Sequence, residues 1–194
     1  MRRGRPASRI LGGMRLGSSA RVTAVSLALA GFALGVGGCD DGGEDPLAVE
    51  TLQRVARAQG DAVGQGFAGV YALAGEPGPC DCPEVENLGD LCAILNVDVP
   101  VLPATVSHYD GLVVVEIGGT IALIGAVEAD GAFATASILN AGLIGADGDL
   151  LSRFDGSFDG EGGVQGELVT RLVADFFGEA IDCRASSTLT NLSL

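Results

Sequence analysis

The most reactive side chains in this sequence are its five cysteines. Four of them, Cys80, Cys82, Cys92 and Cys183, follow Cys39. An even number of cysteines is typical of a disulfide framework in an exported domain. A bridge between Cys80 and Cys82 would close a strained, very short ring, so both other pairings tie the segment around residue 80 to Cys183. We expect Cys82–Cys92 with Cys80–Cys183, because Cys80 lies nearer the first predicted strand.

A second candidate for chemistry is His108, the single histidine. A zinc site of His108 with the cysteines is disfavoured, because Cys-x-Cys followed by a distant cysteine is not a usual zinc pattern. A catalytic triad would need an activated serine beside the histidine, and the sequence holds no Gly-x-Ser-x-Gly motif. His108 precedes a predicted hairpin turn by two residues, so we expect a surface strand residue. The sequence therefore predicts no enzyme, no catalytic residue, no metal and no cofactor.

The stretch that begins at Asp155 is an alternative candidate for metal binding. Asp155, Ser157, Asp159 and Glu161 offer oxygen atoms at alternate positions, as in a calcium loop. The twelfth position is Gly166, where such loops need a bidentate glutamate, and flanking helical patterns are lacking. Two successive hairpin turns explain the same stretch, so we do not assign a metal site to it.

The N-terminal segment carries a different pattern. Six arginines lie within the first 21 residues, and an apolar stretch runs from Val22 to Val36. Gly37, Gly38 and Cys39 follow. A basic region, an apolar region and small residues before a cleavage point form a secretory signal.

This segment resembles the signal of bacterial lipoproteins, in which an aliphatic residue and two small residues precede an invariant cysteine. Val36, Gly37, Gly38 and Cys39 match that pattern position by position. The resemblance implies cleavage after residue 38 and attachment of lipid, including palmitate, to Cys39. It implies a place in the cell envelope, anchored to the outer or inner membrane, with the domain in the periplasm or at the cell surface. An ordinary signal peptide and a membrane-spanning anchor are the alternatives, and translation could start at Met1 or Met14.

The charge distribution supports the same division of the chain. All 25 acidic residues follow Cys39, together with only five arginines and no lysine, which gives residues 39–194 a net charge of about −20. Such a surface repels nucleic acid, so we exclude that partner. It is also repelled by anionic lipid unless a covalent anchor holds it, so we expect the N-terminal lipid to make the membrane contact. Residues 39–45 form an acidic tether.

The remainder, residues 46–194, is predicted to be one domain that starts with a short helix. Asp45 and Pro46 suit an N-cap and a first helical position, and Gly60 would end the helix. From residue 66 onward the apolar residues alternate. A first strand is expected at residues 67–73, and a cysteine- and proline-bearing excursion at residues 75–103.

Five Asp-Gly pairs then punctuate the sequence, and this dipeptide suits tight hairpin turns. They are Asp110-Gly111, Asp130-Gly131, Asp147-Gly148, Asp155-Gly156 and Asp159-Gly160. Strands are expected between them, at residues 105–109, 112–117, 120–128 and 132–140, and three more follow. The fold class is therefore mainly β: an antiparallel meander of about eight strands, closed as a barrel or folded as a sandwich.

Two functions remain open at this point. The first is a lipid-anchored envelope protein whose disulfide-stabilised β domain serves interaction or structure. The alternative is a carrier of a small ligand, because closed eight-stranded barrels can enclose one. Gly69-Val70-Tyr71 resembles the Gly-x-Trp motif of lipocalins, with tyrosine in place of tryptophan. A hollow interior would favour the carrier, and an interior filled by side chains would favour the first function.

Overall fold

The structure is a computed structural model that describes residues 44–85, 89–144, 146–160, 162–176 and 178–192. All of them belong to one compact unit. The predicted signal, Cys39 and most of the acidic tether lie outside the described residues, so the expectations about them stay predictions.

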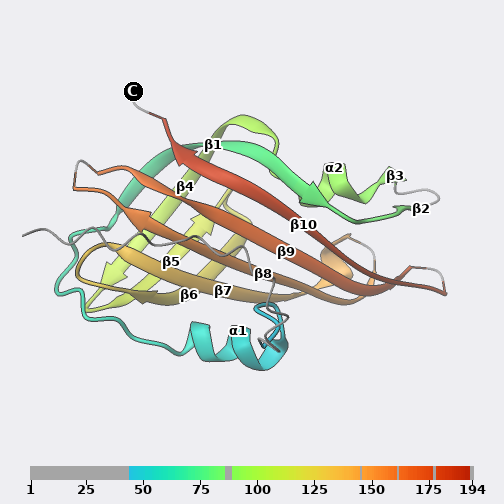
Figure 1. Ribbon diagram of the computed structural model, residues 1–194, viewed down its shortest axis with the longest axis horizontal. Helices are drawn as coiled ribbons and strands as arrows, with labels where there is room; N and C mark the ends of the chain where they lie inside the picture. Colours follow the sequence, from blue (N-terminus) through green and yellow to red (C-terminus); the bar gives the residue numbers. More distant parts are fainter. Residues whose placement is uncertain (1–43, 86–88, 145, 161, 177, 193–194) are drawn as a thin grey trace, which may run out of the picture. The chain divides into compact units, whose positions relative to one another are not determined.

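Eight antiparallel strands form a closed barrel, in the order β1-β10-β9-β8-β7-β6-β5-β4 (Figure 1). From β4 to β10 each strand pairs with the next one along the chain, and β1 closes the barrel by pairing with both β4 and β10. The predicted β meander is thus confirmed, and closure decides in favour of the barrel. The barrel strands are β1 Gly69–Cys80, β4 Val99–Tyr109, β5 Leu112–Ile117, β6 Ile121–Val127, β7 Ala132–Asn140, β8 Asp147–Phe158, β9 Val164–Phe176 and β10 Glu179–Asn191.

The segment between β1 and β4 leaves the barrel. It contains the short strands β2 Glu84–Val85 and β3 Gly89–Asp90, which pair with each other, and the helix α2 Leu91–Leu95. This excursion is shorter than the predicted 75–103, because β1 extends to Cys80 and β4 begins at Val99. In Figure 1 it lies beside the C-terminal end of β1 and next to β10.

The hairpin turns are only partly where Asp-Gly pairs predict them. Asp110-Gly111 and Asp130-Gly131 form turns as expected, whereas Asp155-Gly156 lies inside β8 and Asp147-Gly148 begins it. Gly156 pairs with Gly166 of β9. A Cβ atom at Gly156 would lie 2.7 Å from the Phe133 ring. The strand therefore needs a glycine there for close packing inside the barrel, and not for a turn.

The N-terminal helix exists but begins later than predicted. Helix α1 spans Val49–Ala56, with Ala48 as its N-cap. Asp45 instead forms a turn before the helix, in which its Oδ1 accepts a hydrogen bond from the Leu47 N–H at 3.0 Å. Leu47 and Leu52 are fully buried against Ala136 and Leu151 on the outer side of the barrel. The helix thus covers part of the wall formed by β6, β7 and β8.

Apolar side chains fill the barrel interior. One cluster of buried residues takes in Leu73, Val113, Val115, Leu123, Phe154 and Leu189, each with at most 1% of its surface exposed. Buried hydroxyl side chains lie among the apolar ones, and the Thr135 hydroxyl donates to the Phe154 carbonyl at 3.1 Å. The Ser152 and Thr170 hydroxyls lie 3.4 Å apart. These contacts satisfy polar atoms that burial would otherwise leave without partners.

Candidate functional site

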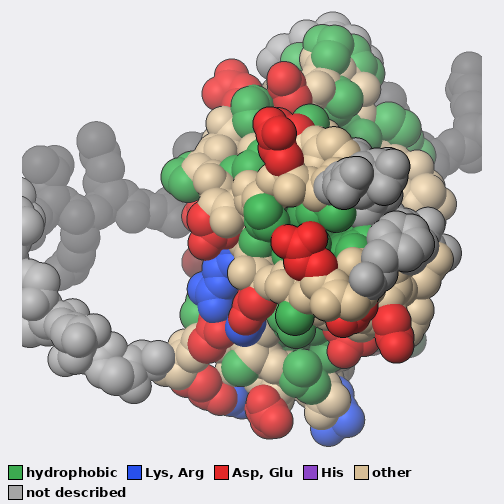
Figure 2. Space-filling model, turned by 90° about the vertical axis from the view of Figure 1, so that its right-hand side faces the viewer, with side chains coloured by type: hydrophobic (Ala, Val, Ile, Leu, Met, Phe, Trp, Pro, Cys, Tyr) green, Lys and Arg blue, Asp and Glu red, His purple; other side chains and the backbone are tan. Residues whose placement is uncertain are grey.

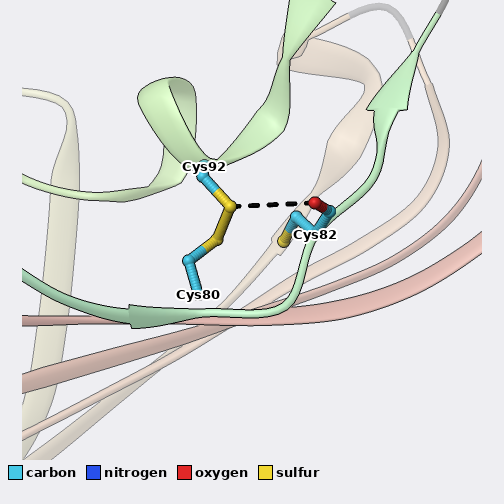
Figure 3. Close-up of side chains that lie close together, drawn as sticks. All are labelled: Cys80, Cys82 and Cys92. Atoms are coloured by element: carbon cyan, nitrogen blue, oxygen red, sulfur yellow. Dashed lines mark hydrogen bonds between the residues drawn. A yellow bond between two sulfur atoms is a disulfide. The ribbon is translucent and has the colours of Figure 1, made fainter.

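The four described cysteines come together at one end of the barrel. Cys80 ends β1, Cys82 follows it, Cys92 lies in α2 and Cys183 lies in β10. They form the bridges Cys80–Cys92, which Figure 3 shows, and Cys82–Cys183. The sulfur atoms of Cys80, Cys82 and Cys92 all lie within 4.8 Å of one another. The predicted disulfides are present, and the two bridges form a single sulfur cluster.

The expected pairing, Cys82–Cys92 with Cys80–Cys183, is wrong, and the strand register explains why. Cys80 stands opposite Ala185 in the antiparallel pairing of β1 and β10. Two residues further along one strand and two residues back along the other, Cys82 stands opposite Cys183, with Cα atoms 4.8 Å apart. The Asp81 N–H donates to the Arg184 carbonyl at 3.0 Å between them. Nearness to the first strand could not reveal this register.

The two bridges hold the excursion over this end of the barrel, which we call the cap end. Val85, Leu91 and Leu95 of the excursion are buried with Leu172, Phe176 and Ile181 of β9 and β10. The Asp90 side chain caps α2 by accepting from the Cys92 N–H at 2.8 Å. Where the excursion returns, the Val97 N–H donates to the Ser187 hydroxyl at 2.8 Å. The cap end thus combines a small apolar core with covalent bonds.

The opposite end of the barrel is closed by residues 58–68, which we call the strap. The Gly60 N–H donates to the Gly111 carbonyl at 3.0 Å, and the Ala62 N–H donates to the Val127 carbonyl at 3.3 Å. The Gly64 N–H donates to the Asp110 carboxylate at 2.9 Å. These bonds tie the strap to the turn between β4 and β5 and to the end of β6. Hydrogen bonds therefore hold the strap in place, whereas disulfides hold the excursion at the cap end.

Aromatic rings pack beneath the strap. The Phe67 ring stacks on Phe158 with centroids 4.9 Å apart, and Phe133 lies 4.8 Å from Phe158 and 5.1 Å from Phe154. The Tyr71 hydroxyl donates to the Phe67 carbonyl at 2.8 Å. Partial burial raises the pKa of Tyr71, and the charge of Asp159 adds to the rise. Tyr71, the last residue of the lipocalin-like motif, thus packs against the interior at this end.

The prediction of a surface position for His108 is wrong. The residue is only 4% exposed, because its side chain points into the barrel and packs on Phe67 with ring centroids 5.2 Å apart. Its Nδ1 accepts a hydrogen bond from the Phe67 N–H at 3.4 Å. Its Nε2 has no partner among the described residues. His108 therefore positions the strap. Its partner Phe67 packs against the interior cluster around Phe158, whereas Cys183, Cys80 and Cys82 belong to the cluster at the cap end.

The described residues of the candidate calcium-binding stretch do not form a single loop, and Glu161 lies outside them. Asp155 and Ser157 belong to β8, and Gln165 and Gly166 belong to β9, so the oxygen-bearing residues extend along a hairpin. The Asp155 carboxylate accepts from the Arg153 guanidinium at 2.7 Å. Asp159 accepts from the Gly163 N–H at 2.6 Å. An EF-hand-like loop instead wraps its ligands around one point, which an extended strand cannot do.

The segment that leads toward Cys39 is fixed to the outer wall of the barrel. The Asp45 carboxylate pairs with Arg171 at 3.0 Å and with Arg184 at 2.6 Å. Arg171 also holds Asp182 at 2.6 Å, and this hydrogen bond lowers the pKa of the Asp182 carboxyl. Glu44 pairs with Arg54 of α1. The tether predicted for residues 39–45 is thus docked on β9 and β10 at its last residue.

Acidic groups surround these arginines. Figure 2 shows acidic side chains spread over the face at the cap end, with the few arginines beside them and apolar side chains between. One shallow hollow on this wall is lined by Asp147, Asp175 and Asp182 together with apolar residues of β9 and β10.

No family model and no curated protein matches this chain. Among the described residues, no helix has the length and apolar character needed to cross a membrane.

Proposed function

We propose that this protein is a lipid-anchored protein of the bacterial cell envelope whose disulfide-stapled barrel serves an interaction or structural role. The observation that carries the proposal is the pair of bridges at the cap end. Structural disulfides form in oxidising compartments outside the cytosol, so they support export of the domain. The signal-like segment that ends at Val36-Gly37-Gly38-Cys39 supports the same route and adds the site of anchorage.

The closed barrel supports a role for the outer surface. Its interior is occupied by buried side chains, and the strap and the excursion cover its two ends. The hollows on the surface are shallow, and one of them is lined by Asp147, Asp175 and Asp182. Lipid on Cys39 would tie this acidic domain to a membrane whose anionic headgroups repel it.

A lipocalin-like carrier is the second candidate. It is favoured by the eight-stranded meander with its first and last strands paired, and by Tyr71 packed at one end. Barrels of this size can hold one small ligand. A ligand would have to displace the strap or the aromatic rings beneath it, because those rings fill that end of the interior.

Metabolic labelling with palmitate tests the anchor. The wild-type protein, expressed in a bacterium with a lipoprotein pathway, should incorporate label and fractionate with membranes. Cys39→Ser should be unlabelled and keep its signal. Cys92→Ser is the matched control, because it removes a cysteine of the local bridge and should still be labelled. Label on Cys39→Ser equal to that of the wild type would overturn the proposed anchor.

Native mass spectrometry separates the two roles of the domain. Protein released gently from the envelope should have the mass of the lipidated polypeptide alone if its interior is filled. A stoichiometric small molecule that leaves on unfolding would favour the carrier, and a retained protein partner would favour the interaction role.

A further inference from the structure

The sulfur cluster at the cap end has a geometry that disulfide formation alone does not require. Each bridge needs two sulfur atoms, yet Cys80, Cys82 and Cys92 place three of theirs within 4.8 Å of one another. The fourth, from Cys183, is bonded to the sulfur of Cys82. Figure 3 shows Cys82 beside the Cys80–Cys92 bridge, with its carbonyl oxygen 3.8 Å from the Cys92 sulfur.

We propose that, once both bridges are reduced, these four cysteines form a thiolate site for one d¹⁰ divalent cation of the Zn²⁺ and Cd²⁺ class. Tetrahedral Zn²⁺ has Zn–S distances of about 2.3 Å, which corresponds to sulfur–sulfur separations of about 3.8 Å. The sulfur atoms of Cys80, Cys82 and Cys92 lie within 4.8 Å of one another, so those of the three that are not bonded to each other need to approach by only about 1 Å. The Cys183 sulfur is bonded to that of Cys82, and reduction frees it to take the fourth position.

The elements that carry the four cysteines have contacts besides the bridges. Cys80 is held by the pairing of β1 with β10, and the hydrogen bond from Asp81 to Arg184 extends that pairing toward Cys82 and Cys183. Cys92 is held by α2, which is capped by Asp90 and buried through Leu91 and Leu95. Reduction therefore leaves all four sulfur atoms attached to elements with contacts of their own.

Binding of the ion requires that both bridges are first reduced. Each disulfide takes two electrons and two protons from one molecule of a dithiol reductant, which leaves as its own disulfide. The cation then replaces four thiol protons and forms four metal–sulfur bonds, so four protons are released for each ion bound. Oxidation by a disulfide of the same class reverses the sequence and expels the ion. The cap end would thus hold either two bridges or one ion.

Cobalt(II) titration of the full-length protein that carries Cys39→Ser provides the test, because this background removes the fifth thiol and does not depend on lipidation. The protein is folded in oxidised form in detergent, reduced with a phosphine and freed of reductant under nitrogen. We expect thiolate-to-cobalt charge-transfer bands and tetrahedral d–d bands that saturate at one Co²⁺ per chain. One equivalent of Zn²⁺ should displace them and release four protons, and the oxidised protein should bind none.

Two further variants sharpen the result. Adding Cys183→Ser should weaken Zn²⁺ binding at least tenfold and shift the charge-transfer bands, because an oxygen atom replaces one sulfur. Adding His108→Asn should change neither, because His108 packs on Phe67 at the strap end. Three results would each overturn the proposal: octahedral cobalt spectra, saturation at another stoichiometry, or equal Zn²⁺ affinity of the urea-unfolded chain. The comparison with the unfolded chain remains decisive even if Cys183→Ser does not fold.

Discussion

The two ends of the barrel are closed by different physical means. At the cap end, two disulfides tie the excursion to β1 and β10 around a small apolar core. At the strap end, backbone hydrogen bonds and a stack of aromatic rings perform the same task without a covalent bond. The excursion offers few elements of regular structure, and its strands β2 and β3 span two residues each. The difference indicates that the segment with little structure of its own is the one that is cross-linked.

The largest effect should come from breaking the longer bridge. Cys82 and Cys183 are 101 residues apart, whereas Cys80 and Cys92 are 12 apart. Because a longer closed loop restricts the unfolded chain more, we expect Cys82→Ser/Cys183→Ser to lower the free energy of unfolding by about 5 kcal/mol and Cys80→Ser/Cys92→Ser by about 3 kcal/mol. Chemical denaturation under non-reducing conditions measures both. A larger loss from the shorter bridge would contradict this ranking.

The strap end should respond to the loss of its central ring. Phe158 is 4% exposed and contacts Phe67, Tyr71 and Phe133. Phe158→Ala should lower the free energy of unfolding by about 4 kcal/mol, because it leaves a cavity among these rings. Amide exchange should speed up in the strap and stay slow in α2. Equal acceleration at the cap end would show that the two ends are not independent.

A smaller effect is expected from His108. In His108→Leu the partly buried Phe67 N–H loses its acceptor, at a cost of about 1 kcal/mol. Exchange of the Phe67 amide proton, followed by NMR, should accelerate in this variant. His108→Asn is the control, because its side-chain oxygen can accept where Nδ1 did. Unchanged exchange in His108→Leu would mean that the strap does not depend on this bond.

The smallest effect concerns the ion pair between Arg171 and Asp182, which lies beside the docked residue Asp45. Hydrogen bonding to Arg171 lowers the pKa of the Asp182 carboxyl below its ordinary value of 3.8. The ion pair therefore stabilises the fold fully above that value, and its contribution is lost as the pH falls through the lower folded pKa. Because half of the Asp182 side chain is exposed, Asp182→Asn should cost less than about 1 kcal/mol at pH 7. The variant should also show a shallower loss of stability below pH 4, and a steeper one would contradict the assignment.

Local patterns were sufficient to predict the middle of the barrel. The bounds of β5 and β7 agree with the strands predicted at residues 112–117 and 132–140, because alternating apolar residues and Asp-Gly turns specify short hairpins. The same turn signal failed inside β8, where Gly156 provides space for the Phe133 ring. A glycine required by a neighbour's side chain cannot be distinguished in sequence from one required by a turn.

The sites were harder to predict because they depend on distant residues. That the cysteines pair was predictable from their even number, but their partners depend on the register that places Cys82 opposite Cys183. His108 was expected at the surface because it precedes a hairpin turn by two residues, and its alternation with Ser107 and Tyr109 does not say which face is inward. It is buried because Phe67, from the strap 41 residues earlier, covers it.

The mass of the intact protein, isolated from the cell envelope and measured before and after reduction, tests the central claim most directly. We expect a polypeptide that begins at Cys39, carries diacylglycerol and acyl groups there, and gains four hydrogen atoms on reduction, two for each bridge. A chain that begins elsewhere, an unmodified Cys39, or a mass unchanged by reduction would contradict the account of a lipid-anchored, doubly stapled barrel.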